Sequence, residues 1–340
     1  MLHKRYLSFN AEAIALGLRA GILGVIFSVI YVLYAHDNLN FILALIGVFI
    51  ASLIETVALK SSTKDQVIHG LVISFAASIS LTLGSITAHH PLLLTIGMLV
   101  FMLPVGLSAG SKPLTATTIL FISNQFIIGS GLPAPAHAAI IYGIYLFIGG
   151  VALVISGYLQ NLIFKNKYDF VTHPDNNKIF TFNRANLKFA LKLSIAVCAA
   201  NAIAGYLKFP QQYCAPMTAL LILRADHEVS IERTSHRLFG TLIGSVLAAL
   251  LILLIHDKLI LALLMLPALF FIVVSMAKHY GAYVFFLTAM VSILFNLIEY
   301  DGIMVPVDRV LFTLLGVSSV IAVVYVSKLI ARILENPRFE

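Results

Sequence analysis

The chain has 340 residues, of which 60% are hydrophobic and only 11% are charged. An ordinary soluble domain carries about 25% charged residues, and a soluble fold of this length could not bury so much apolar surface. The composition therefore excludes a soluble enzyme, a nucleic-acid-binding domain and a disordered chain. It predicts a polytopic membrane protein whose segments lie in a lipid bilayer.

The excess of 22 Lys and Arg over 15 Asp and Glu gives a net charge of +7. In a membrane protein, basic loop residues set the topology and do not indicate a nucleic-acid partner. Cys198 and Cys214 lie in apolar surroundings without a CxxC spacing, and the histidines show no metal-ligand spacing. We therefore predict no metal, no cofactor and no enzymatic activity.

Long apolar runs divide the chain into spans, and their length favours helices over the alternating strands of a barrel. Counts of ten to twelve fit the sequence, and we adopt twelve. The predicted spans are residues 11–34, 40–59, 66–88, 91–108, 113–131 and 137–163, then 185–207, 211–225, 236–256, 258–277, 280–299 and 304–331. The first run is interrupted by Arg19 and is too long for a signal peptide, so we expect it to be retained.

The predicted loops alternate in charge along the chain. Sixteen basic residues, Arg237 among them, fall on one side, against at most three on the other, Lys208, Lys258 and Arg309. The positive-inside rule then places the first side, together with both termini, in the cytoplasm.

A polar stretch at residues 166–183 predicts a short cytoplasmic linker between two six-span halves, residues 1–165 and 184–340. Three matches in the same order indicate an internal duplication: Arg19 with Lys192, Gly70 with Gly240, and Gly150 with Gly316. Because six spans return the chain to its starting side, the two repeats are parallel. Transporters built from such repeats place the substrate path between the halves.

Two cations lie deep inside predicted spans, Arg19 in the first and Lys192 in the seventh. Charge inside a membrane is costly and marks a functional site by default. Either cation could bind an anionic substrate. The alternative for Arg19 is a salt bridge with Glu12, which lies one heptad earlier on the same helix face.

Two titratable residues near the cytoplasmic ends of spans are candidates for carrying protons. Glu55, in the second span, either carries a proton or pairs with Lys60 or Arg19. His69, near the start of the third span, either relays protons or is a hydrogen-bonded structural histidine.

Residues 213–244 form the most informative stretch of the sequence. Pro216 interrupts an apolar run and predicts a kinked or broken helix, as at many transporter sites. A mixed-charge stretch from Arg224 to Arg237 then predicts a cytoplasmic loop. Gly240 and Gly244 form a GxxxG pair, which lets another helix approach closely and is typical of plain helix packing.

This stretch resembles the fusaric acid resistance (FUSC) and aromatic acid exporter superfamily. The resemblance covers mainly residues 184–330 and rests on Tyr213-x-x-Pro216-x-Thr218, Arg237-x-x-Gly240-Thr241-x-x-Gly244, Arg309 before Gly316, and Tyr280 with Tyr283. It implies an all-α, multi-pass protein of the bacterial inner membrane. It also implies proton-driven efflux of small aromatic or other organic acids.

The resemblance and the intramembrane charges together give a site hypothesis. The predicted substrate-binding residues are Arg19, Lys192, Arg237 and Arg309 for the carboxylate, and Tyr213, Tyr280 and Tyr283 for the ring. The predicted proton-coupling residues are Glu55, His69 and Asp226. The predicted helix-packing or kink residues are Pro216, Thr218, Gly240, Thr241, Gly244 and Gly316.

Two other functions remain open from the sequence. In a passive organic-anion channel, the same cations would line a pore, which a homo-oligomer could complete. A related plant family of malate-conducting proteins favours this alternative. A membrane assembly protein without transport is the second, although the short loops offer little surface to partners.

Overall fold

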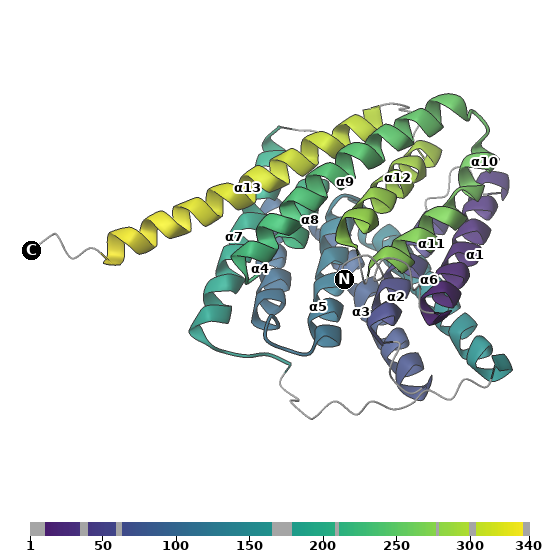
Figure 1. The fold of residues 1–340 in the computed structure, drawn as a ribbon, viewed down its shortest axis with the longest axis horizontal. Coiled ribbons are helices and arrows are strands. Elements are labelled where there is room, and N and C mark those ends of the chain that lie inside the picture. Colours follow the sequence, from purple (N-terminus) through teal and green to yellow (C-terminus); the bar gives the residue numbers. More distant parts are fainter. Residues whose placement is uncertain are drawn as a thin grey trace, which may run out of the picture. The chain divides into compact units, whose positions relative to one another are not determined.

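The computed structural model describes residues 11–34, 40–58, 63–164, 179–207, 211–276, 279–298 and 304–335. The regular structure in these ranges is helical (Figure 1). Within them, eight helical segments are long and apolar enough to cross a membrane. The prediction of a polytopic all-α membrane protein is therefore confirmed. Twelve crossings, their arrangement as parallel repeats and the cytoplasmic termini stay predictions.

Each predicted span contains helix. The first half forms α1 (Ala11–Tyr34), α2 (Asn40–Ala58), α3 (Thr63–Thr87), α4 (Pro91–Leu107), α5 (Pro113–Ser130) and α6 (Ala136–Phe164). Pro91 and Pro113 begin their helices, where a missing N–H group costs nothing and the fixed φ suits the helix. Residues 166–178, most of the predicted linker, lie outside the described residues.

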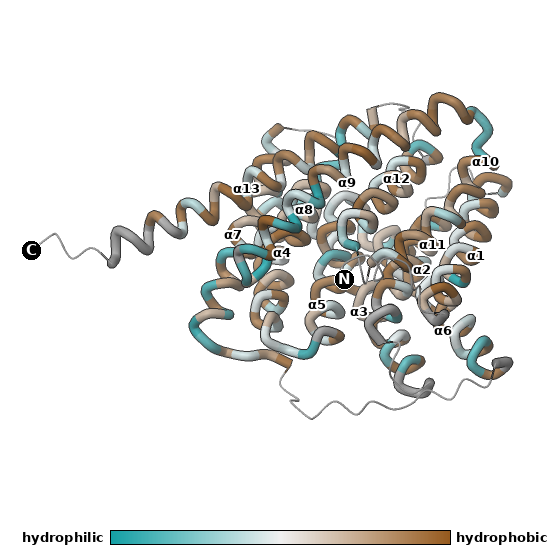
Figure 2. The backbone as a smooth tube through the Cα atoms, in the orientation of Figure 1, coloured by the Kyte–Doolittle hydropathy of each residue, from teal (hydrophilic) through white to brown (hydrophobic). Residues whose placement is uncertain are grey.

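The second half departs from the prediction in three places. It forms α7 (Arg184–Tyr206), α8 (Cys214–Ile222), α9 (His227–Leu254), α10 (Lys258–Leu263), α11 (Met265–Met276), α12 (Tyr280–Ile298) and α13 (Met304–Glu335). The span predicted at 258–277 forms one segment long and apolar enough to cross a membrane, Lys258–Met276, but its helix is interrupted at Leu264, because Pro267 in the next turn cannot donate a backbone hydrogen bond. The span at 211–225 holds only the nine residues of α8, and α9 begins well before residue 236. Figure 2 shows that the first turns of α9 are hydrophilic and that its later turns are hydrophobic.

The chain divides into two compact units, and each unit takes helices from both halves of the sequence. The first unit contains Met1–Ile79, Ile140–Asp175 and Phe239–Val307, and the second contains Ser80–Ala139, Asn176–Leu238 and Asp308–Glu340. The repeats proposed at 1–165 and 184–340 are units of sequence, and their boundaries stay a prediction.

In the first unit, α1 packs closely along α11 (Figure 1). Gly17, Gly21 and Gly24 form a row on α1, and a Cβ atom on Gly21 would lie 2.8 Å from the Leu266 carbonyl oxygen. Small residues of this kind let helix backbones approach each other inside a membrane. The core beside this contact consists of Leu16, Ala20, Val48, Ala51, Leu153 and Val273.

In the second unit, α5 lies in backbone contact with the end of α3. Gly129 faces the Leu81 carbonyl oxygen, and Gly84 faces that of Phe126. The Ser80 hydroxyl donates to the Ile122 carbonyl at 2.7 Å. Such hydrogen bonds between helices accompany small residues in membrane bundles. The α3–α5 crossing therefore depends on the absence of side-chain atoms at two glycines.

We expect Gly129→Ala to lower the free energy of unfolding by about 1–3 kcal/mol, because the new methyl group would overlap the Leu81 backbone. Gly205→Ala is the matched control, since its Cβ atom would lie 3.6 Å from Gln212 Oε1, its nearest neighbour. Thermal unfolding of the two purified variants in detergent measures the difference. Equal midpoints for both variants would contradict the close crossing.

Candidate functional site

Most of the predicted carboxylate- and proton-binding residues fall into two buried polar clusters, one within each compact unit. In the first unit, Arg19 Nη2 donates to Glu55 Oε1 at 2.5 Å. The two side chains are only 15% and 17% exposed. Glu55 is thus the partner of Arg19, one of the alternatives predicted for it. The side chain of Glu12, the other predicted partner, lies outside the described residues.

Three helices build this ion pair. Arg19 comes from α1 and Glu55 from α2, and both lie against Gly157 of α6. A Cβ atom on Gly157 would overlap Arg19 Nη1 and lie 3.4 Å from Glu55 Oε1. Arg19 Nε and Nη1 are buried without a hydrogen-bond partner among the described residues. The guanidinium therefore has donors in reserve beyond those that Glu55 uses.

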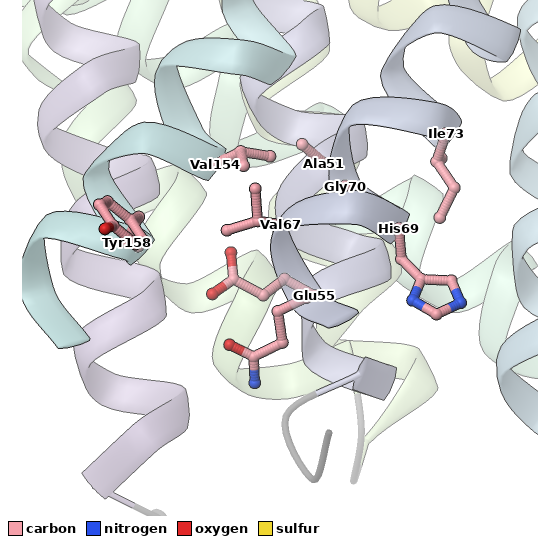
Figure 3. Close-up of a pocket in the computed structure, with 10 residues that line it drawn as sticks. Ala51, Glu55, Val67, His69, Gly70, Ile73, Val154 and Tyr158 are labelled. Carbon is pink, nitrogen blue, oxygen red and sulfur yellow. The ribbon is translucent and has the colours of Figure 1, made fainter. Parts of the chain in front are cut away.

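A pocket of about 460 Å³, part of it open to the surroundings, lies beside the ion pair. Its lining is Ala51, Glu55, Gln66, Val67, His69, Gly70, Ile73, Val154, Gly157 and Tyr158. Figure 3 shows the Glu55 side chain beside Val67, with the His69 ring pointing away from the Glu55 carboxylate. His69 is exposed. Glu55 and His69 thus line the same partly open pocket, but the His69 ring does not face the Glu55 carboxylate. We call Arg19, Glu55 and this lining the ion-pair pocket.

The second cluster lies in the second unit and consists of Tyr213, Cys214, Arg237 and Arg309, which we call the arginine cluster. These side chains are between 2% and 6% exposed. Arg309 Nη2 donates to Tyr213 Oη at 3.4 Å, and its guanidinium carbon lies 6.0 Å from the centre of the tyrosine ring. Cys214 lies within electrostatic range of both arginines and of the half-buried Asp308. Two buried cations thus share one neighbourhood beside an aromatic ring.

The short helix α8 positions this cluster. Tyr213 immediately precedes it, and all nine of its residues are buried. Pro216 lies in the first turn of α8, where proline is tolerated. The kink predicted at Pro216 is therefore not formed. The break comes instead after Ile222. The backbone of Arg224 then donates to Ser230 Oγ at 2.9 Å. Irregular backbone in a membrane protein is tolerated where protein covers it or where it lines a cavity.

The structure corrects the predicted loop before Arg237. The sequence placed Arg237 where a charged loop meets the span at 236–256, but α9 begins at His227, so most of that stretch is helical and Arg237 lies about 15 Å along a continuous helix. The exposed Asp226 accepts a hydrogen bond from the Glu228 N–H group at 2.9 Å, as helix-capping aspartates do. Arg237 is 4% exposed, and its Nε and Nη1 have no hydrogen-bond partner among the described residues.

The predicted packing residues lie where helices meet. Gly244 faces the Phe285 carbonyl oxygen of α12, at 2.5 Å from an added Cβ atom, and Gly240 faces that of Gly281 at 2.9 Å. Thr241 between them is buried. In the second unit, Gly316 of α13 faces the Ala215 carbonyl and the buried side chain of Thr218 on α8.

Three predicted substrate-binding residues lie outside the two clusters. Tyr280 and Tyr283 stack on each other at the start of α12, with ring centres 5.9 Å apart, within the first unit. Lys192 is half-buried on α7. Sequence reasoning missed the role of Gly157, and it also missed two buried carboxamides on α5, Asn124 and Gln125. Their signal was two consecutive amides within an apolar run.

The described residues contain no group of three or more His, Cys, Asp or Glu side chains that could hold a metal ion. The polar side chains of the two clusters are arginines, carboxylates and a tyrosine, and α5 adds two buried amides. Such groups bind anions and protons.

Part of this chain is similar to known proteins. Residues 197–323 match the family described as fusaric acid resistance protein-like. An uncharacterized protein of Haemophilus influenzae is 30% identical over 140 residues, 40% of this chain and 19% of that protein. An uncharacterized protein of Synechocystis is 28% identical over 115 residues, 34% of this chain and 15% of that protein.

The match thus spans less than a fifth of the length of each of these relatives. No solved structure matches the chain. Tyr213, Arg237 and Arg309 all lie within the region that matches the family. The resemblance predicted from these residues is therefore confirmed: residues 197–323 are similar to the family described as fusaric acid resistance protein-like.

Proposed function

We propose that this protein is a secondary transporter of the bacterial inner membrane that exports small organic carboxylates, aromatic ones above all, in exchange for protons. The family match and the apolar helices support a membrane transporter. The observation that carries the substrate class is Arg237, whose guanidinium is buried with two nitrogens that have no hydrogen-bond partner among the described residues.

A buried cation is costly unless an anion pairs with it. The planar guanidinium donates two parallel hydrogen bonds, which match the two oxygens of a carboxylate. Arg309 adds a second positive charge near Cys214, the residue that also lies within range of Arg237. A carboxylate held here would stabilise two guanidinium groups at once.

Tyr213 and α8 support the same assignment. The tyrosine ring lies beside the Arg309 guanidinium, so an aromatic substrate could pack on the ring or under the cation. The first turn of α8 follows Tyr213 directly, and the N-terminal end of a helix favours negative charge. Broken helices whose ends face an anionic substrate group are a recurring feature of secondary transporters.

The ion-pair pocket supports coupling to protons. Protonation of Glu55 would remove its negative charge and release the Arg19 guanidinium from its 2.5 Å contact. A proton carrier must also exchange protons with water, and Glu55 lines a pocket that is partly open. We therefore assign proton coupling to Glu55, with Arg19 as the group that responds to its charge.

Arg237→Gln should reduce uptake of labelled benzoate into proteoliposomes by about 10-fold or more, because a hydrogen bond to a charged group contributes about 1.5–3 kcal/mol. Arg184→Gln is the matched control, because it removes the same charge from an exposed residue at the start of α7. Uptake by Arg237→Gln at the parent rate, with correctly inserted protein, would refute the carboxylate site.

Glu55→Gln should abolish accumulation driven by an imposed pH gradient while exchange of internal for external substrate continues, because the glutamine cannot take up a proton. Inverted vesicles with and without a protonophore measure the two activities. Glu232→Gln, which changes an exposed carboxylate on α9, should behave as the parent. Gradient-driven accumulation by Glu55→Gln would remove the coupling role, and single-channel currents from the parent protein would favour a passive channel.

A further inference from the structure

Two adjacent carboxamides lie buried in the otherwise apolar helix α5. Gln125 is fully buried, and both its Oε1 and its Nε2 lack a hydrogen-bond partner among the described residues. Asn124 is 5% exposed, and its Oδ1 also lacks a hydrogen-bond partner among the described residues. Both belong to the second unit but lie outside the arginine cluster and outside residues 197–323.

Several buried hydroxyl groups find a hydrogen-bond acceptor on a nearby backbone carbonyl, whereas those of Ser28, Ser245 and Ser292 have no partner among the described residues. Ser78 donates to the Ser74 carbonyl at 2.7 Å, and Ser194 donates to the Ala190 carbonyl at 2.9 Å, each within its own helix. Ser123, next to the amides, donates to the Phe101 carbonyl at 2.7 Å. A carboxamide offers two donors and an acceptor, and burying it without partners is unfavourable. Two consecutive amides in this condition point to a ligand that supplies the partners.

The elements that pack against α5 define the sides of this helix. The end of α3 covers the backbone at Phe126 and Gly129. α4 packs through Phe101, which stacks on Phe126 with ring centres 4.6 Å apart. The Tyr213 ring lies against Gly131, just beyond the end of α5.

Asn124 stands seven residues before Gly131. Two turns of helix separate the positions, so they share a face of α5 and are about 10 Å apart along its axis. This is the side on which α5 meets Tyr213 and α8. Asn124 therefore lies about one ligand length from Tyr213 of the arginine cluster along this helix face, and Gln125 follows about 100° further around the helix, on the side of α5 that carries Gly129.

We infer that Asn124 and Gln125 bind an uncharged polar group, a hydroxyl or a carbonyl, at the far end of an elongated acid whose carboxylate the arginine cluster holds. The inference rests on the proposed function and adds a specificity site to it. The amide nitrogens would donate to the ligand oxygen, and the amide oxygens would accept from a hydroxyl. An acid with only a hydrocarbon at that end would leave the amides unpaired, so the site selects against it.

The test compares two acids of nearly the same shape, 3-(4-hydroxyphenyl)propanoate and 3-(4-methylphenyl)propanoate. We expect the parent protein in proteoliposomes to take up the hydroxyl acid faster at low concentration. Gln125→Met, which keeps the side-chain length, should reduce the hydroxyl-to-methyl uptake ratio by about 10-fold, the effect of one buried hydrogen bond. Asn124→Leu should shift the ratio in the same direction. Ser123→Ala is the matched control and should leave the ratio unchanged.

The outcomes separate this inference from the function beneath it. If the parent protein transports neither these acids nor benzoate, the proposed function fails. If it transports both acids and the ratio is the same in the parent, Gln125→Met and Asn124→Leu, only the amide site is overturned. Should the variants not fold, thermal unfolding of the parent protein decides. Stronger stabilisation by the hydroxyl acid than by the methyl acid is expected, and equal stabilisation overturns the site.

Discussion

A charged group buried among apolar helices must find an opposite charge or enough hydrogen bonds, and this requirement organises both polar clusters of the protein. Arg19 meets it within the protein, because α2 brings Glu55 to 2.5 Å and α6 offers a glycine where any larger residue would intrude. Arg237 has no carboxylate partner among the described residues, and its Nε and Nη1, like those of Arg19, have no hydrogen-bond partner there. The contrast between a paired and an incompletely paired cation is the basis on which the two clusters receive different roles.

Close backbone contact makes such clusters possible. The ion pair depends on Gly157, and the contact between α8 and α13 depends on Gly316. The α3–α5 crossing depends on Gly84 and Gly129. Without a hydrophobic driving force between helices in lipid, small residues and interhelical hydrogen bonds hold the bundle together. The same residues bring polar side chains from different helices within reach of one another. Packing and site chemistry are therefore carried by the same set of positions.

The sequence predicts the helices well because each long apolar run has a single way to satisfy its backbone in lipid. It fails where tertiary contacts decide. The sequence offers both Glu12 and Glu55 as partners of Arg19 and does not choose between them, because the ion pair that forms joins residues 36 positions apart. The charged residues before Arg237 predict a loop. In the structure Asp226 caps α9, so these charged residues lie in a helix. The carboxamides on α5 look unremarkable until their burial and missing partners are known.

Two helices, α9 and α13, contribute residues to both compact units. α9 contributes Arg237 to the second unit and, one turn later, Gly240 to the packing of the first. α13 likewise begins in the first unit and carries Arg309 in the second. Arg237 and Gly240 are about one turn apart on α9, so one short segment of helix carries both a residue of the arginine cluster and a packing glycine. The proposed function assigns proton binding to Glu55 and carboxylate binding to the arginine cluster, and coupled transport requires that occupation of one site change the affinity of the other.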